Sequence, residues 1–146
     1  MDRPVSAHRS VNPDSLSAPW GFSHVVVPAP GRTIYLAGET GHTRDGTIAE
    51  DLVDQFSVAC QNVVTALAAA DAQPHHIVSL QIFTTHLDEY LARSGEIGRA
   101  YRERFGQHFA ASALVGVAGL VGGAKVELMC VAVKPEHQET QGRDTR

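Results

Sequence analysis

The feature that most constrains the fold is a change in the spacing of apolar residues at Gln73-Pro74. Before this dipeptide, apolar residues recur every three or four positions after a capping box at residues 47–50, which predicts an amphipathic helix. After it, residues 77–85 alternate between apolar and polar side chains, which predicts a strand inside a sheet. The apolar positions of the helix are Leu52, Phe56, Cys60, Val63 and Leu67.

Shorter β-rich runs on both sides of this helix and strand complete the predicted sheet. Residues 23–27 and 32–37 are separated by a turn that contains two prolines and a glycine, which predicts an antiparallel hairpin. Residues 112–118 and 124–133 predict two final strands, joined by a glycine-bearing connection.

A second helix is predicted between residues 90 and 105, with an irregular start because Gly95 and Gly98 disfavour a helix interior. The expected order is β-β-α-β-α-β-β in an α/β (α+β) fold. Two helices can cover only one face of such a sheet, so we expect another subunit to cover the second face. The apolar residues left on that second face are Ile77, Phe83, Met129, Val131 and Val133.

The length of 146 residues fits one domain. We expect an irregular leader over residues 1–18, a folded domain over residues 19–134 and a flexible tail over residues 135–146. The formal charge of −4 shows no basic footprint, so no nucleic-acid partner is expected. The sequence contains no apolar run that approaches the roughly 20 residues needed to cross a bilayer, so we expect no membrane association and a cytoplasmic location.

Residue types common in metal and nucleophile sites lack the spacing that such sites need. The eight histidines show no HxxxH or HxH pattern, and Cys60 and Cys130 lie within apolar segments as expected for core residues. No GxSxG elbow surrounds any serine. We therefore expect neither a metal nor a cofactor.

Glu127 stands out because it lies within the apolar run of residues 126–133. A buried carboxylate with a raised pKa can act in proton transfer. Alternatively, Glu127 lies on a solvated strand face and alternates with Val126 and Leu128. Spacing alone favours the solvated position.

Several motifs, taken in order, resemble the Rid (YjgF, RidA-like) family over residues 11–134. The motifs are residues 12–16, 19–24, 35–41, 61–63 with Leu67, 83–85, 111–117 and 126–128. The resemblance implies a chorismate-mutase-like fold, a homotrimer with clefts between subunits, and hydrolysis of reactive enamines and imines without a cofactor.

Carried over residue by residue, the resemblance departs from the family at its substrate anchor. The arginine that holds the substrate carboxylate in the family corresponds to Ser112, which carries no charge. Arg32 or Arg44 is left as a candidate replacement. The water-orienting glutamate of the family corresponds to Glu127, which favours a cleft carboxylate over a solvated one. An aromatic cleft residue corresponds to Phe22.

Four further positions fall beside the family's cleft. Backbone groups near Gly38 and Glu39 are expected there, and Leu114 stands where the family often has cysteine. Asp88 either lines the cleft or caps the second helix, because Thr85 and Asp88 also fit a capping box. The sequence thus predicts a divergent imine or enamine deaminase or hydrolase acting on a small molecule. The alternative is a non-enzymatic ligand-binding or chaperone-like trimer.

Overall fold

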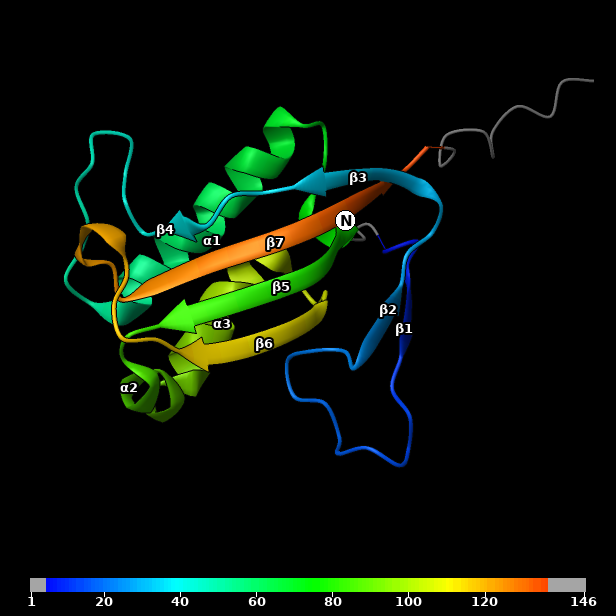
Figure 1. Ribbon diagram of the computed structural model, residues 1–146, viewed down its shortest axis with the longest axis horizontal. Coiled ribbons are helices and arrows are strands. Elements are labelled where there is room, and N and C mark those ends of the chain that lie inside the picture. Colours follow the sequence, from blue (N-terminus) through cyan, green and yellow to red (C-terminus); the bar gives the residue numbers. More distant parts are fainter. Residues whose placement is uncertain (1–4, 137–146) are drawn as a thin grey trace, which may run out of the picture.

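The protein folds around one mixed sheet with helices α1 and α3 behind it (Figure 1). The computed structural model describes residues 5–136. The strand order is β3-β7-β5-β6, β4 also pairs with β7, and β5 and β6 run parallel. The strands of this sheet are β3 (Gly31–Tyr35), β4 (Glu39–Thr40), β5 (Ile77–Thr84), β6 (Ala111–Gly116) and β7 (Val126–Pro135). The predicted α/β fold is confirmed.

The first predicted helix is confirmed as α1 (Leu52–Ala69), but it begins later than expected. Its N-cap is Asp51, whose carboxylate accepts a hydrogen bond of 3.1 Å from a backbone N–H of the first turn. The capping box expected at residues 47–50 does not form, because the Thr47 hydroxyl bonds to Asp45 within the preceding loop at 3.0 Å. A short 3-10 helix, η1 (Pro74–His76), separates α1 from β5.

The core lies between α1, α3 and the sheet, and a β-bulge changes its composition from the prediction. Ile77 of β5 pairs with Ala132, whereas Ser79 pairs with Val131, so β5 contains one extra residue. The bulge turns Ile77 toward the helices, where its side chain is buried. The expectation that Ile77 lies on the second face of the sheet is therefore wrong.

The N-terminal strands also pair differently from the prediction. β2 (Val25–Val27) pairs with β1 (Arg9–Val11) as a separate ribbon, and β3 pairs with β7. The chain between β2 and β3 contains Pro28 and Pro30, which have no backbone N–H to continue a hairpin ladder. The predicted hairpin is therefore wrong, and the leader expected to be irregular over residues 1–18 contains a strand.

The second predicted helix consists of two helices, α2 (Leu87–Ala92) and α3 (Ser94–Phe105). They meet at Arg93, whose backbone leaves the helical region with φ −107° and ψ 27°. The Arg93 guanidinium joins three carboxylates, one at the N-cap of α1, one in α2 and one in α3. These ion pairs are to Asp51 at 2.6 Å, Glu89 at 3.2 Å and Glu96 at 2.7 Å. They fix the α2–α3 joint to the start of α1.

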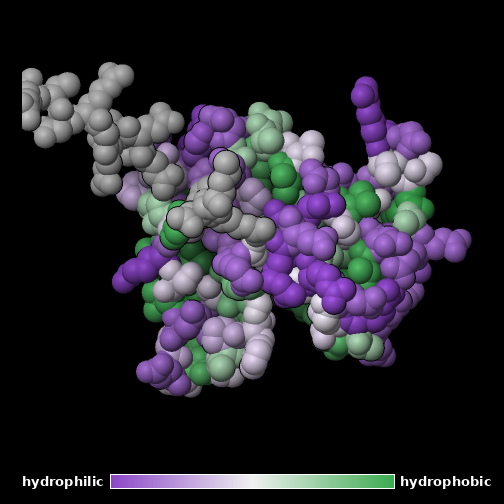
Figure 2. Space-filling model, turned by 180° about the vertical axis from the view of Figure 1, so that it is seen from behind, coloured by the Kyte–Doolittle hydropathy of each residue, from purple (hydrophilic) through white to green (hydrophobic). Residues whose placement is uncertain are grey.

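The sheet face turned away from α1 and α3 is here termed the open face, and it is turned toward the viewer in Figure 1. Strand register and alternation assign to it Thr33, Tyr35, Ser79, Gln81, Phe83, Ala113, Val115, Glu127, Met129, Val131 and Val133. Seen from the opposite, helix side, the molecule presents mainly hydrophilic residues (Figure 2). Phe83, Val115, Met129 and Val131 give the open face an apolar part that neither α1 nor α3 covers.

At its C-terminal end β7 continues to Pro135, one residue into the tail expected over residues 135–146. Residues 137–146, and residues 1–4 of the expected leader, lie outside the described residues. Across the described part of the chain, no helix has the length and apolar character needed to span a membrane.

Candidate functional site

Glu127 lies on the open face of β7, opposite Thr40 of β4 and Phe83 of β5. Its chain neighbours Val126 and Leu128 are fully buried on the helix side, so the expected alternation is present. The Glu127 side chain is itself half-buried. The carboxylate therefore lies on a face of the sheet that no helix among the described residues covers.

Gly38 provides the space that the Glu127 carboxylate occupies. A Cβ atom built at position 38 would lie only 2.7 Å from Glu127 Cδ. Any other residue here would force the carboxylate to move. Gly38 and Glu127, which the family resemblance assigned to the cleft, are therefore in contact.

Glu39 brings a second carboxylate close to Glu127. Its register opposite Leu128 places it toward the helix side of the sheet. Burial, and after it the negative charge of Glu127, raise the pKa of Glu39 above its usual value. The sequence reasoning considered only backbone groups here and missed this side chain, because a glutamate in a two-residue strand carries no periodic signal of burial.

Two amide side chains of α1 hold the strands that carry these carboxylates. Asn62 Nδ2 donates to the carbonyl oxygens of Thr40 and His42, both at 2.9 Å. The buried Gln55 accepts a 2.8 Å hydrogen bond from the backbone N–H of Lys125, the residue before β7. The long helix thereby fixes β4 and the start of β7 relative to each other.

Three other predicted residues, Phe22, Ser112 and Leu114, line one pocket of about 650 Å³ beside β6. Ser112 pairs with Leu80 and Leu114 with Ile82, so both lie on the helix side of the sheet. This pocket is termed the edge pocket. Its walls include Trp20, Phe22, Tyr101, Arg102, Phe109 and Ser112.

The loop between β1 and β2, termed the rim loop (residues 12–24), carries two of the aromatic rings of the edge pocket. The side-chain oxygen of Asn12 accepts a hydrogen bond from the backbone N–H of His24 at 2.8 Å, which closes the loop at its base. Ser23 donates from its backbone N–H to the Ala110 carbonyl at 3.0 Å. The loop is therefore attached both to itself and to the start of β6.

Asp88 lies at a third place, in the first turn of α2. The N-cap of α2 is His86, whose backbone N–H donates to the Thr84 hydroxyl at 3.1 Å. The capping box between Thr85 and Asp88 therefore does not form. Asp88 lines an open pocket of about 600 Å³ with Thr84 and Gly116.

A single chain therefore holds the predicted site residues at three separate places. Glu127 lies on the open face, whereas Ser112 lies on the helix side, and β5 runs between their strands. Asp88 lines neither the edge pocket nor the surroundings of Gly38.

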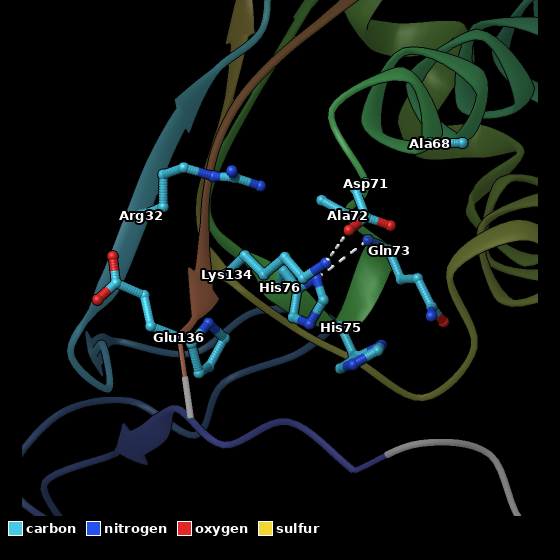
Figure 3. Close-up of a pocket in the computed structure, with 10 residues that line it drawn as sticks. Arg32, Ala68, Asp71, Ala72, Gln73, His75, His76, Lys134 and Glu136 are labelled. Carbon is cyan, nitrogen blue, oxygen red and sulfur yellow. Dashed lines mark hydrogen bonds and ion pairs between the residues drawn. The ribbon is translucent and has the colours of Figure 1, made fainter. Parts of the chain in front are cut away.

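The two arginines considered as replacement anchors lie away from the edge pocket. Arg32 lines a different pocket, of about 850 Å³ (Figure 3), and donates to the Ala70 carbonyl at 3.3 Å. In the same pocket Lys134 forms an ion pair of 2.5 Å with Asp71. Arg44 lies in the exposed loop before α1 and lines no part of the edge pocket.

Two histidines also line the pocket in Figure 3. His76 is only 5% exposed, and its Nδ1 accepts a 3.0 Å hydrogen bond from the backbone N–H of Gln73. Burial, with a smaller contribution from the neighbouring His75, lowers the pKa of His76 to about 4. Within residues 5–136, no three histidine, cysteine or carboxylate side chains converge to hold a metal ion.

These features define a class of protein: a small α/β domain with a carboxylate on an open sheet face and an aromatic pocket at the parallel edge. A family model described as endoribonuclease L-PSP matches residues 13–134. The chain therefore belongs to the YjgF/Rid family.

Relatives and solved structures agree with this assignment. A RutC family protein of Pasteurella multocida, PM1466, is 29% identical over 91 residues, covering 62% of this chain and 70% of the relative. UK114 of Drosophila melanogaster, also of the RutC family, is 27% identical over 104 residues, covering 70% and 72%. The crystal structure of the Rid family protein YyfB of Yersinia pestis has a TM-score of 0.77 and 27% identity, covering 87% and 98%.

Proposed function

We propose that the protein hydrolyses small, labile imines or enamines with release of ammonia, and that Glu127 orients the attacking water. The observation that carries this proposal is the half-buried Glu127 carboxylate on the open face, with its space provided by Gly38. Membership of the YjgF/Rid family supports it, because the resemblance implies this chemistry.

Imine hydrolysis needs an oriented water molecule and an electrophilic carbon. A carboxylate such as Glu127 accepts the proton of the water as its oxygen bonds to the imine carbon. The π electrons pass to nitrogen, which gives a carbinolamine, and the protonated Glu127 returns its proton to that nitrogen. The C–N bond then breaks as the hydroxyl group loses its proton to the Glu127 carboxylate and becomes the carbonyl, and ammonia leaves. An enamine enters the same sequence after a proton from solvent adds to its carbon and converts it to the imine. The negative charge of Glu127 favours the positively charged iminium form over the neutral imine.

The proposed cleft is completed by assembly into a homotrimer. Met129 and Val115 on the open face are each 40% exposed, and a second copy would remove them from water. Assembly through this face would also place Glu127 of one copy next to a pocket of another. This arrangement accounts for site residues that lie on opposite sides of the sheet in one chain.

The test is ammonia release from a panel of enzymatically generated imines and enamines, including one neutral member. Glu127→Gln keeps the size of the side chain but removes its charge, and we expect at least a hundredfold lower rate. Glu103→Gln, at an exposed position of α3, is the matched control and should retain the wild-type rate. Equal rates for wild type and Glu127→Gln would contradict the role of Glu127.

A non-enzymatic ligand-binding or chaperone-like trimer is the second candidate, and Ser112 in place of the family's arginine favours it. No acceleration on any member of the panel, with the trimer intact, would support that candidate. The matching family model is described as an endoribonuclease, but a net charge of −4 disfavours binding to the phosphates of RNA, and RNA cleavage is not proposed for this chain.

A further inference from the structure

We propose that the edge pocket binds small carboxylic acids with an aromatic or bulky apolar group, and that Arg102 of α3 binds their carboxylate. The inference rests on the proposed function in that it names the substrate class for the same site. It assigns to Arg102 the charge that Ser112 cannot supply.

The walls of the edge pocket are suited to a flat apolar group. The rings of Tyr101 and Phe109 stack with centroids 5.7 Å apart and planes inclined by 8°. Trp20 at the rim is 87% exposed, so a ligand ring placed against it removes a large apolar surface from water. Phe22 and Leu114 extend this apolar lining on the side of the rim loop and β6.

Arg102 is placed to meet the charged end of such a ligand. It is the residue with a charged side chain among the described residues that line the edge pocket. A Cβ atom built at Gly98 would lie 3.0 Å from Arg102 Nη1, so the guanidinium extends back along α3 over this glycine. A guanidinium has five N–H donors and binds a carboxylate through two of them, which leaves others for contacts within the chain.

The remaining polar groups of the pocket fit this division into an apolar and a charged part. The Tyr101 hydroxyl donates its hydrogen to the carbonyl of His108, so it does not donate to a ligand in the pocket. Ser112 and Ser94 contribute small hydroxyl groups that take up little volume. A pocket of about 650 Å³ with this lining discriminates against small acids, which would leave its aromatic walls in contact with water.

The proposal is tested by titrating the assembled protein while recording the fluorescence of Trp20, the one tryptophan in the sequence. The probes are phenylacetate, its neutral analogue phenylacetamide, and acetate, with calorimetry as a second readout. We expect phenylacetate to bind about tenfold more tightly than phenylacetamide, which corresponds to one charge-assisted contact, and acetate to bind weakly. Arg102→Gln should abolish the preference for the acid.

Two variants separate binding by Arg102 from a general effect on α3. Arg99→Gln changes a charge on the same helix outside the pocket and should keep the preference. Gly98→Ala should stabilise α3, because alanine favours a helix, yet weaken phenylacetate two- to fivefold by displacing the guanidinium. A residue with only a structural role would not change stability and binding in opposite directions.

Equal affinity of the wild type for phenylacetate and phenylacetamide, or an unchanged preference in Arg102→Gln, would overturn the inference. Its failure is distinguishable from failure of the proposed function. Acid-selective binding without ammonia release supports the inference and removes the deaminase. Ammonia release without any acid preference removes the inference alone.

Discussion

Gly38 and Glu127 show how a residue without a side chain determines where a carboxylate lies. The carboxylate of Glu127 occupies the space beside position 38, and the second carboxylate, at Glu39, is close enough to feel its charge. The position of a glycine, which has no chemistry of its own, thus controls the geometry of an acidic pair.

Gly38→Ala is expected to reduce ammonia release at least tenfold while leaving the domain folded. The added Cβ would meet the flexible end of Glu127, 2.7 Å from Cδ, so the carboxylate moves and the backbone does not. Activity assays and thermal melts check both parts. Gly95→Ala, where a Cβ meets nothing within 4 Å, is the matched control. Wild-type activity in Gly38→Ala would show that the carboxylate position is unimportant.

At the scale of secondary-structure elements, the joint between α2 and α3 depends on one arginine. The Arg93 guanidinium bonds to carboxylates of α2, of α3 and of Asp51, which is also the N-cap of α1. The guanidinium lowers the pKa of Asp51 below its usual range through their hydrogen bond. Three helix ends are held together by this group.

Arg93→Ala should lower the free energy of unfolding by a small but measurable amount, because the three ion pairs are lost but are partly exposed and screened by water. Urea denaturation measures this change. Arg44→Ala, which removes the same side chain from an exposed loop, should leave stability within the error of the measurement. An equal loss in both variants would show that the joint contributes nothing specific.

The sequence predicted most elements of the fold, but it did not predict their partners. The period of apolar residues identified α1 and β5, since it depends on which residues each element buries. The pairing of β3 with β7, and the bulge that buries Ile77, depend on contacts between residues far apart in the chain. Local spacing carries no information about such contacts, and so the hairpin prediction failed.

For the candidate site, family resemblance identified positions that periodicity could not. Gly38 was found in this way, whereas Glu127 already stood out within its apolar run and the resemblance favoured a cleft position for it. The structure places the two residues in contact. Glu39 was assigned only through its backbone. Arg102 was not predicted, because an exposed arginine on a helix is ordinary until the fold places it beside Ser112 and Trp20.

At the scale of the whole molecule, a cluster of histidines connects segments that are distant in sequence. The members are His8, His75, His76 and His108. His8 of the N-terminal arm donates to the Val133 carbonyl of β7 at 2.8 Å, and Nε2 of His108 bonds to the Ile77 carbonyl at 2.7 Å. Burial lowers the pKa of three of these rings, and the charges of their neighbours lower it further.

Stability should therefore decrease as the pH falls from about 6.5 to about 4. Unfolded histidine binds a proton near pH 6.5, whereas folded His76 does so only near pH 4, so the unfolded chain takes up more protons between these values. We expect a loss of about 2 to 3 kcal/mol from His76 over this range. The Asp71–Lys134 pair adds to the loss only at lower pH, because its salt bridge lowers the pKa of Asp71.

Urea denaturation between pH 7.5 and 4.5 measures this dependence. His76→Asn keeps a hydrogen-bond acceptor for the Gln73 N–H but cannot take up a proton, so its stability should change less with pH than that of the wild type. The same slope in both proteins would mean that His76 does not control the acid sensitivity.

The closed base of the rim loop has a consequence for how this protein can evolve. Since the Asn12–His24 hydrogen bond and the attachment of Ser23 hold both ends, residues between them can be replaced or inserted at little cost in loop-closure entropy. Natural selection can thus alter the aromatic rim without disturbing the strands behind it. Duplicated genes could diverge in the molecules they recognise while inheriting the same acidic centre.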